Sequence, residues 1–262
     1  MTDGSASSDG SAGSDGLAGL AGSPVVPAAP AGAEHWSVAG RTVLVAGATS
    51  AAGLAVASAL SDAGARVIAV GSNPERLQAL RERVPGVITR VCDLSNFTAV
   101  TKLAATVHAE AAHHGHGSID GLIHLVGGWR GGGGLDGQTD DDWDFLHSHI
   151  VTTLRNTTRA FNSDLLASPA GRLAIVSSVS VDKPTPGGAN YASAKAAAET
   201  WTRAVGQGFA KAPVPVSGHS AAAVIFVVRA LEGLEAELAE GVVGLWEKDA
   251  ASVNNTRIPL VT

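Results

Sequence analysis

Three residues in the second half of the chain have the types and spacing needed to move a proton to or from a substrate oxygen. Tyr191, the only tyrosine, stands four positions before Lys195, and Ser178 stands thirteen positions before Tyr191. Residues four apart share one face of a helix, so the phenol and the ammonium should point into one pocket. A nearby ammonium favours the phenolate and lowers the pKa of a tyrosine from its ordinary value of about 10. Such a phenol can act as acid and base, while Ser178 hydrogen-bonds the same oxygen.

These residues need a framework, and the apolar pattern predicts one. From Arg41 onward, short β-branched runs alternate with longer Ala-rich segments. Runs that are continuously apolar indicate strands buried on both faces, as in a parallel sheet covered by helices. The expected strands are Thr42–Ala46, Arg66–Val70, Val87–Cys92, Gly121–Val126, Arg172–Ser177, Ala222–Val228 and Arg257–Val261. The expected helices are Ala51–Asp62, Pro74–Arg83, Phe97–His113, Thr139–Leu166, Tyr191–Lys211 and Leu231–Asp249.

Repeated strand–helix units predict an α/β fold, a doubly wound Rossmann-type parallel sheet of about seven strands with helices on both faces. We expect one domain over residues 36–262. Residues 1–35 consist mainly of Gly, Ala, Ser, Pro and Asp, and we expect them to form a disordered tail.

Composition excludes several classes of function. The formal net charge of −6 offers no basic field for nucleic acid, and no apolar run is long enough for a membrane span. With no signal peptide expected and Cys92 as the sole cysteine, we expect a cytoplasmic protein. His108, His113, His114 and His116 lack the ligand pattern of a zinc site, so no metal is expected.

A glycine turn follows the first expected strand. The segment Ala46-Gly-Ala-Thr-Ser-Ala-Ala-Gly53 opens an Ala-rich helix. Glycine is needed where backbone amides and a helix N-terminus approach a diphosphate. Gly47 and Gly53 occupy the outer places, whereas Ala51 replaces the usual middle glycine.

Together with Ser178, Tyr191 and Lys195, this turn resembles the short-chain dehydrogenase/reductase family over about Trp36 to Thr262. The resemblance implies that Tyr191 is the acid/base, that Lys195 holds the nicotinamide ribose and tunes the phenol, and that Ser178 orients a carbonyl. It also implies a cofactor site formed by Gly47, Thr49, Ser50, Ala52, Gly53, Asp93, Leu94, Val126 and Gly127.

The end of the second strand bears on the choice of cofactor. It reads Val70-Gly71-Ser72-Asn73, without the acidic residue that would bind the ribose hydroxyls of NAD. We therefore favour NADP over NAD, with Ser50 and Ser72 as neutral donors to a 2′-phosphate and Arg76 nearby in sequence. An unspecialised loop is the alternative interpretation.

Several positions depart from the family pattern. The helix asparagine of the family falls on Ile150, the Pro-Gly after the sixth strand is replaced by Val228-Arg229-Ala230, and the long insertion that covers the substrate is absent. Gly127-Gly128-Trp129-Arg130-Gly131-Gly132 resembles the dihydropteridine reductase branch, in which a Gly-Gly-Trp segment lines a pocket for a flat pterin. We therefore take Trp129 as a candidate substrate residue, either stacked on a planar substrate or packed under its own glycine loop. The run Gly131–Gly134 is expected to form a mobile rim.

The leading hypothesis is an NAD(P)H-dependent oxidoreductase that transfers hydride between nicotinamide and a small carbonyl or alcohol, with Tyr191 as acid/base. One alternative is reduction of a flat pterin or imine, and another is a catalytically weak NAD(P)-binding sensor or support subunit. The resemblance also implies a homodimer or homotetramer paired through Thr139–Leu166 and Tyr191–Lys211.

Overall fold

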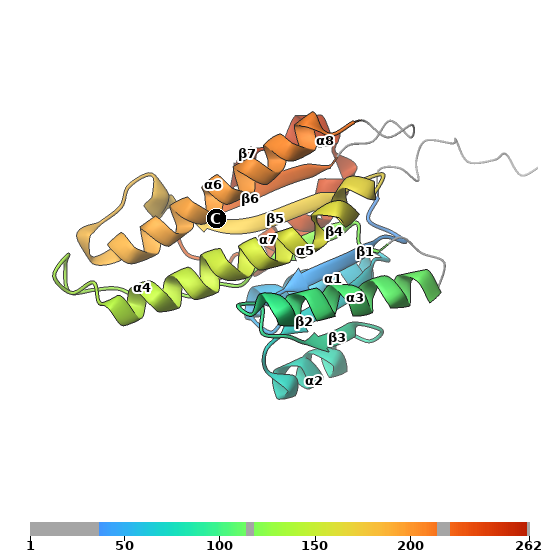
Figure 1. Cartoon of the computed structure of the whole chain (residues 1–262), viewed down its shortest axis with the longest axis horizontal. Helices are drawn as coiled ribbons and strands as arrows, with labels where there is room; N and C mark the ends of the chain where they lie inside the picture. Colours follow the sequence, from blue (N-terminus) through green and yellow to red (C-terminus); the bar gives the residue numbers. More distant parts are fainter. Residues whose placement is uncertain (1–36, 114–117, 214–220, 261–262) are drawn as a thin grey trace, which may run out of the picture. The chain divides into compact units, whose positions relative to one another are not determined.

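Seven parallel strands form one sheet in the order β3-β2-β1-β4-β5-β6-β7 (Figure 1). The structure is a computed structural model, and it describes residues 37–113, 118–213 and 221–260. The expected tail 1–35 and the strand end at Val261 lie outside the described residues. The strands are β1 (Thr42–Ala46), β2 (Arg66–Gly71), β3 (Ile88–Val91), β4 (Gly121–His124), β5 (Arg172–Ser178), β6 (Ala222–Val228) and β7 (Thr256–Pro259).

The strand order reverses beside β1, because β2 and β3 extend the sheet on one side of it and β4 to β7 extend it on the other. Val43 pairs with Val67 of β2 on one side and with Gly121 of β4 on the other. In sheets of this kind, ligands bind at this reversal, beyond the carboxyl ends of the strands. The predicted doubly wound parallel fold is confirmed.

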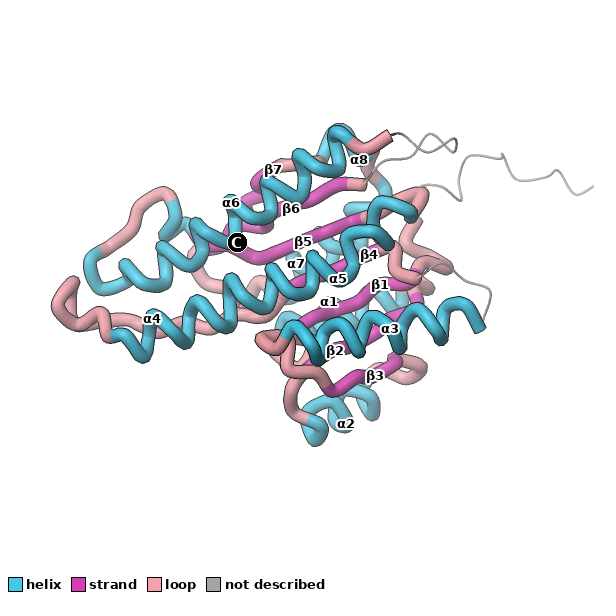
Figure 2. Tube along the Cα trace, in the orientation of Figure 1, coloured by secondary structure: helices cyan, strands magenta, loops and turns pink. Residues whose placement is uncertain are grey.

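Helices cover both faces of the sheet, as the cyan and magenta segments of Figure 2 show. Asn73, Asn96 and Thr139 cap their helices by accepting hydrogen bonds from backbone N–H groups in the first turn. None of the described helices is both long and apolar enough to cross a membrane. The helices are α1 (Ala51–Asp62), α2 (Pro74–Arg83), α3 (Phe97–His113), α4 (Asp140–Leu146), α5 (Thr153–Ala167), α6 (Ala189–Lys211), α7 (Glu235–Val243) and α8 (Ala250–Val253).

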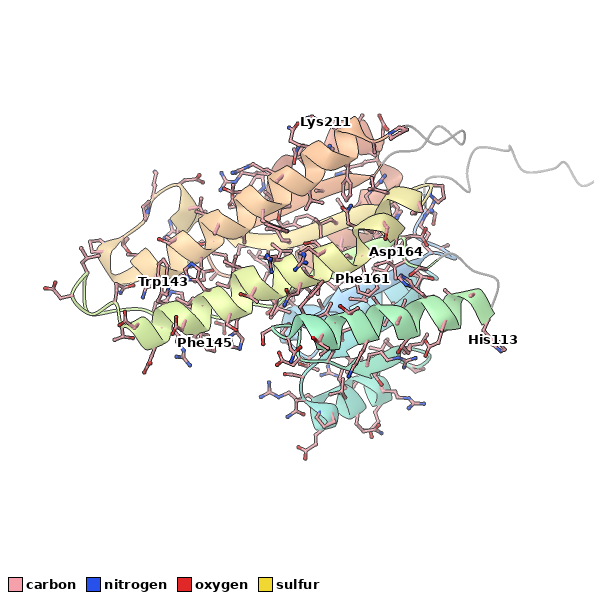
Figure 3. The ribbon with its side chains drawn as sticks, in the orientation of Figure 1. His113, Trp143, Phe145, Phe161, Asp164 and Lys211 are labelled. Carbon is pink, nitrogen blue, oxygen red and sulfur yellow. The ribbon has the colours of Figure 1, made fainter. Side chains whose placement is uncertain are left out.

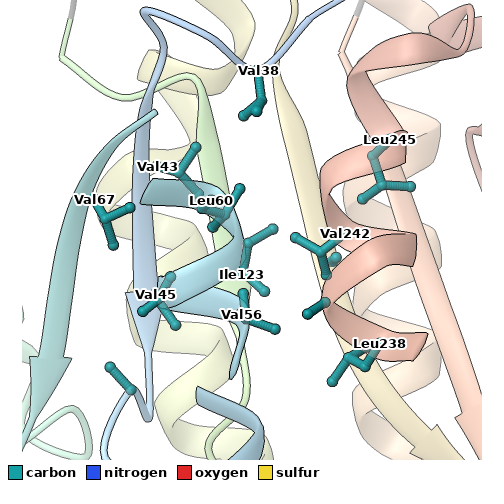
Figure 4. Packing of buried hydrophobic residues seen from close by; sticks show 14 of the residues in the cluster. Val38, Val43, Val45, Val56, Leu60, Val67, Ile123, Leu238, Val242 and Leu245 are labelled. Atoms are coloured by element: carbon teal, nitrogen blue, oxygen red, sulfur yellow. The ribbon is translucent and has the colours of Figure 1, made fainter. Parts of the chain in front are cut away.

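Two apolar layers fix the positions of these helices. On one face, α1, α2 and α7 pack on the sheet; Figure 4 shows Val45 and Ile123 of the sheet facing Val56 of α1 and Val242 of α7. On the other face, α3, α5 and α6 bury a second cluster that includes Phe161. The carboxyl ends of β1, β4 and β5 are thereby held at one edge.

Two predicted helices differ from the structure. The segment expected as one helix over Thr139–Leu166 contains a π-helical stretch, His147–Thr152, between α4 and α5. A π turn accommodates an extra residue per turn and rotates the side chains that follow. The helix expected over Leu231–Asp249 begins only at Glu235 and passes into a 3₁₀ turn at Gly244.

Candidate functional site

The turn after β1 is shaped by two glycines that no other residue could replace without movement. Gly47 has φ +81°, and a Cβ there would lie 2.9 Å from the backbone of Leu125 and Val126. A Cβ on Gly53 would lie 2.5 Å from the carbonyl oxygen of Gly47. The turn, the end of β4 and the N-terminus of α1 therefore form a narrow backbone cradle that fits a diphosphate.

Ser50 is part of this cradle and also caps the N-terminus of α1. Its hydroxyl accepts a hydrogen bond from Gly53 N at 3.0 Å and donates to Gly47 O at 3.1 Å. Ala51, in place of the usual middle glycine, is exposed and does not disturb the turn.

A cavity of about 450 Å³ lies over the ends of β1, β2 and β3. Thr49, Ser72, Arg76 and Asp93 are among the residues that line it. Most of the predicted cofactor residues meet here: Gly47, Thr49, Ser50, Ser72, Asp93, Leu94, Val126 and Gly127.

The loop after β3 is held by a residue that the sequence analysis missed. Asp93 accepts hydrogen bonds from the backbone and hydroxyl of Ser95, at 2.9 and 2.7 Å. The buried side chain of Asn156, on α5, donates to Leu94 O and Ser95 O at 3.0 and 2.9 Å. The available signal was a polar amide on the buried face of an amphipathic helix.

A second cavity of about 690 Å³ adjoins the first and is lined by two of the three predicted catalytic residues, whereas Ser178 is buried and is not among its lining residues. Tyr191, Lys195 and Trp129 line it, together with Ala52 at the start of α1. The two cavities share part of their walls, namely Ser50, Leu125, Val126 and Gly127. Residues that sequence reasoning missed here are His124, Val176, Ser177, Arg229, Glu232 and Glu235.

Helix α6 and strand β5 bring Tyr191, Lys195 and Ser178 to this edge of the sheet. The ammonium of Lys195 donates to Val176 O at 2.8 Å and lies 5.7 Å from the centroid of the Tyr191 ring. Ser178 is buried, accepts from Ser180 N and donates to the Ser180 hydroxyl, both at 3.1 Å.

Burial reverses one expectation about the phenol. The pKa of Tyr191 is raised by burial, and its hydrogen bond with Ser178 opposes this only in part. Burial also lowers the pKa of Lys195 to about 8, against the field of Glu199. The prediction that Lys195 lowers the pKa of Tyr191 is therefore wrong for this structure: burial raises that pKa, the opposing contribution comes from Ser178, and the ammonium of Lys195 donates to Val176 O.

Trp129 is exposed over 66% of its surface and lines the second cavity, so it is not packed under its own loop. The glycine loop that follows is tied to the segment before Tyr191. Gln138 donates to the carbonyl oxygens of Gly132 and Gly187 at 3.1 Å, and accepts from Asn190 N at 3.0 Å. The loop expected as a mobile rim is thus fastened to the start of α6.

The position of the family's helix asparagine lies in the π-helical stretch. Ile150 is buried in an apolar cluster, whereas its neighbour His149 lines the first cavity. The His149 ring donates from Nδ1 to Phe145 O at 2.9 Å and stacks on Phe145 with 4.0 Å between centroids. Arg130 lies over the same Phe145 ring at 3.7 Å. Figure 3 shows Phe145 and Trp143 on the part of α4 that extends beyond the strands.

The histidines of the chain lie in different surroundings. His124 is 3% exposed, its Nε2 has no hydrogen-bond partner among the described residues, and burial lowers its pKa to about 3. His108 contacts Asp164 at 3.0 Å, while His114 and His116 lie outside the described residues. In the described part of the chain, no three His, Cys, Asp or Glu side chains are placed to hold a metal.

Comparison with known proteins identifies the family to which the chain belongs. The short chain dehydrogenase family matches residues 41–225. The 2,3-dihydro-2,3-dihydroxybenzoate dehydrogenase of Bacillus subtilis (strain 168) is 28% identical over 173 residues, covering 64% of each chain. Dehydrogenase/reductase SDR family member 6 of Rattus norvegicus is 30% identical over 171 residues, covering 65% of each chain. The chain therefore spans slightly less than two thirds of the length of these two relatives.

A solved structure has the same fold. A metagenomic short-chain oxidoreductase in complex with NADP superimposes with a TM-score of 0.70 at 22% identity, covering 86% of this chain and 99% of the other. The sheet order, the glycine turn and the family match agree, and the chain belongs to the short-chain dehydrogenase/reductase family of oxidoreductases.

Proposed function

We propose that this protein is an NADP(H)-dependent oxidoreductase that interconverts a small carbonyl compound and its alcohol. The observation that carries the proposal is the shared wall of the two cavities, at Ser50, Leu125, Val126 and Gly127. A dinucleotide laid along that wall would have its phosphates at the Gly47 turn and its nicotinamide beside Tyr191. When bound, the nicotinamide supplies or accepts the hydride.

The residues of the chain would handle the proton and the substrate oxygen. The Tyr191 hydroxyl is protonated at neutral pH, and burial raises its pKa further, so it can donate to the oxygen of a carbonyl that is being reduced. Ser178, which hydrogen-bonds with the phenol, can hold the same oxygen as charge develops on it. Gly127 leaves room beside the ammonium, since a Cβ there would lie 3.7 Å from Lys195 Nζ.

The preference for NADPH rests on the charges around the first cavity. Arg76 and the hydroxyls of Ser50, Thr49 and Ser72 line it, and Asp93, after β3, is the one carboxylate among the described residues that line it. A 2′-phosphate would gain charge-assisted hydrogen bonds there, and NADH would not.

We predict that Arg76→Ala weakens NADPH binding about 10- to 100-fold and leaves NADH binding within about threefold. Titration followed by energy transfer from tryptophan to the nicotinamide measures both affinities. Arg81→Ala is the matched control, because Arg81 lies on the same helix but lines a different cavity. Equal losses for the two cofactors, or tighter binding of NADH by the unchanged protein, would contradict the assignment of NADPH.

A second candidate function is reduction of a flat pterin-like or imine substrate, and the exposed Trp129 indole in the second cavity favours it. If the substrate stacks on this ring, Trp129→Ala should lower kcat/KM about 10-fold or more, while Ser178→Ala has little effect. If the substrate is a carbonyl compound held by Ser178, the order of the two effects reverses. Trp143→Ala, another half-exposed tryptophan, is the control. Tight cofactor binding without turnover of either substrate class would support the sensor or support-subunit alternative.

A further inference from the structure

A fully buried carboxylate lies behind the proposed active site. Glu199 is 0% exposed and stands on α6 one helical turn after Lys195. Its Oε1 accepts a hydrogen bond from the Ser177 hydroxyl at 2.7 Å, beside Ser178 at the end of β5. Arg203, one turn further along α6, also contacts it. Burying a carboxylate is costly unless it is paired and hydrogen-bonded, and all these contacts serve that purpose.

Arg257 connects this carboxylate to the segment that follows Ser178. Arg257 belongs to β7, the edge strand, and its Nε lies 3.2 Å from Glu199 Oε2. Its two terminal nitrogens donate to the two oxygens of Asp182, each at 2.9 Å. Such a fork-to-carboxylate contact fixes orientation as well as distance.

Asp182 ends the short turn that Ser178 begins. The 3₁₀ turn Val179–Val181 starts from the Ser178 cap, and Asp182 N donates to Val179 O at 3.1 Å. The end of β5, this turn, α6 and β7 thus meet on Glu199, Arg257 and Asp182. We call these three residues the rear ion cluster.

We propose that the rear ion cluster is a positioning unit of the active site: it holds the strand end and turn that carry Ser178, and its Glu199 carboxylate keeps Lys195 in the ammonium form. The proposal rests on the proposed function for the roles of Ser178 and Lys195. Glu199, Arg257 and Asp182 touch neither cavity and act through those residues.

The electrostatics around Lys195 support the second half of the proposal. Burial favours the neutral amine, and the field of Glu199 opposes it. His124, which faces Lys195 from β4, is neutral because burial and the ammonium lower its pKa to about 3. Tyr191, one turn earlier, is neutral at pH 7, and burial raises its pKa further. Neither of them stabilises an ammonium by charge, so that role falls to Glu199.

Arg229, Glu232 and Glu235 line the second cavity together with Lys195. Around Glu199 itself, the charged groups are Arg203, Arg257 and Asp182. The two arginines partly neutralise Glu199, so their removal should strengthen the field of Glu199 at Lys195. Removing the Glu199 carboxylate and removing the Arg257 guanidinium should therefore change the pKa of Lys195 in opposite directions. Loss of the carboxylate disfavours the ammonium, whereas loss of the Arg257 guanidinium does not.

The test compares Glu199→Gln, Arg257→Gln and Arg257→Lys in the full chain, by the pH dependence of kcat/KM for carbonyl reduction with NADPH. We expect Glu199→Gln to move the alkaline loss of activity down by about one pH unit. Arg257→Gln should lower kcat about tenfold through displacement of Ser178, without moving that loss downward. Arg257→Lys should recover only part of the rate, since a single ammonium cannot reproduce the fork to Asp182.

The chain contains a matched control at the opposite edge of the sheet. Arg90 of edge strand β3 pairs with Glu110 of α3, as Arg257 of β7 pairs with Glu199 of α6. Arg90→Gln should leave both kcat and the pH profile unchanged. If Arg90→Gln and Arg257→Gln have equal effects, or if Glu199→Gln leaves the alkaline limb in place, the proposal is overturned.

A second readout needs no turnover, so it separates this proposal from the proposed function. Urea unfolding of Glu199→Gln, Lys195→Met and the double variant gives their coupling between pH 7 and pH 10. We expect coupling at pH 7 that fades as Lys195 loses its proton, and zero coupling at all pH values would refute the pairing. If Glu199→Gln does not fold, Asp182→Asn is used instead, because Asp182 is exposed and its loss should lower kcat severalfold with the fold intact.

Discussion

Tyr191→Phe is expected to reduce the rate of carbonyl reduction by about 10²- to 10⁴-fold, the range that a positioned general acid contributes. The hydroxyl is protonated at neutral pH, burial raises its pKa further, and Tyr191 lines the second cavity together with Lys195. Phenylalanine keeps the ring, which packs against the apolar cluster of Ile150 and Leu154, so the fold should not change. Single-turnover reduction with NADPH measures the chemical step directly.

Two further measurements give this result its meaning. NADPH affinity should stay within about threefold of the unchanged protein, since the hydroxyl is one small part of a long binding surface. The melting temperature should also be retained. A variant that keeps the full reduction rate would show that the proton comes from elsewhere, and a water molecule would then be the next candidate.

Much of the fold could be predicted because the buried strands have uninterrupted apolar sequences. The run Ala222–Val228 is buried at every position, as a strand covered on both faces requires. The glycine turn was also accessible to sequence reasoning, because close backbone approach at Gly47 and Gly53 excludes side chains. The spacing of Tyr191 and Lys195 predicted that they share one face of a helix, and both line the second cavity, whereas their catalytic roles stay predictions.

The features that were missed depend on contacts between distant segments. Arg257 reaches Glu199 across 58 positions of sequence, and Asn156 reaches Leu94 across 62. No local pattern distinguishes such residues from solvated ones. The π-helical stretch was missed for a related reason. The segment His147–Thr152 has the composition of an ordinary helix, and its π form differs only in which backbone groups are hydrogen-bonded to each other.

The pKa of Tyr191 illustrates the same limit in energetic terms. Sequence spacing placed an ammonium near the phenol but could not give the degree of burial, and burial decides the direction of the shift. Trp129 was equally balanced between stacking and packing until the fold placed its indole in the open cavity. Spacing therefore predicted which residues lie together better than it predicted their pKa values.

Lys195→Met is expected to abolish reduction and yet to stabilise the protein at pH 7. Burial lowers the pKa of Lys195 from 10.5 to about 8, so the folded state holds this proton less tightly than the unfolded state. That difference destabilises the folded protein by about 3 kcal/mol at pH 7, where both states carry the ammonium. Loss of the hydrogen bond to Val176 O returns about 1 to 2 kcal/mol, which leaves a net gain of about 1 to 2 kcal/mol. Urea unfolding measures it.

The pH dependence distinguishes this explanation from simple improvement of packing. The destabilising effect of Lys195 is fully present below its folded pKa of about 8 and is lost as pH rises toward 10.5, the pKa of the unfolded state. The advantage of Lys195→Met should therefore shrink from pH 7 to pH 10 and end as a disadvantage, since the methionine cannot donate to Val176 O. Lys102→Met, at an exposed position of α3, should show no such trend. A constant advantage at all pH values would mean that the buried ammonium of Lys195 does not destabilise the folded protein. It would contradict the argument that burial lowers the pKa of Lys195 and that the carboxylate of Glu199 opposes this effect.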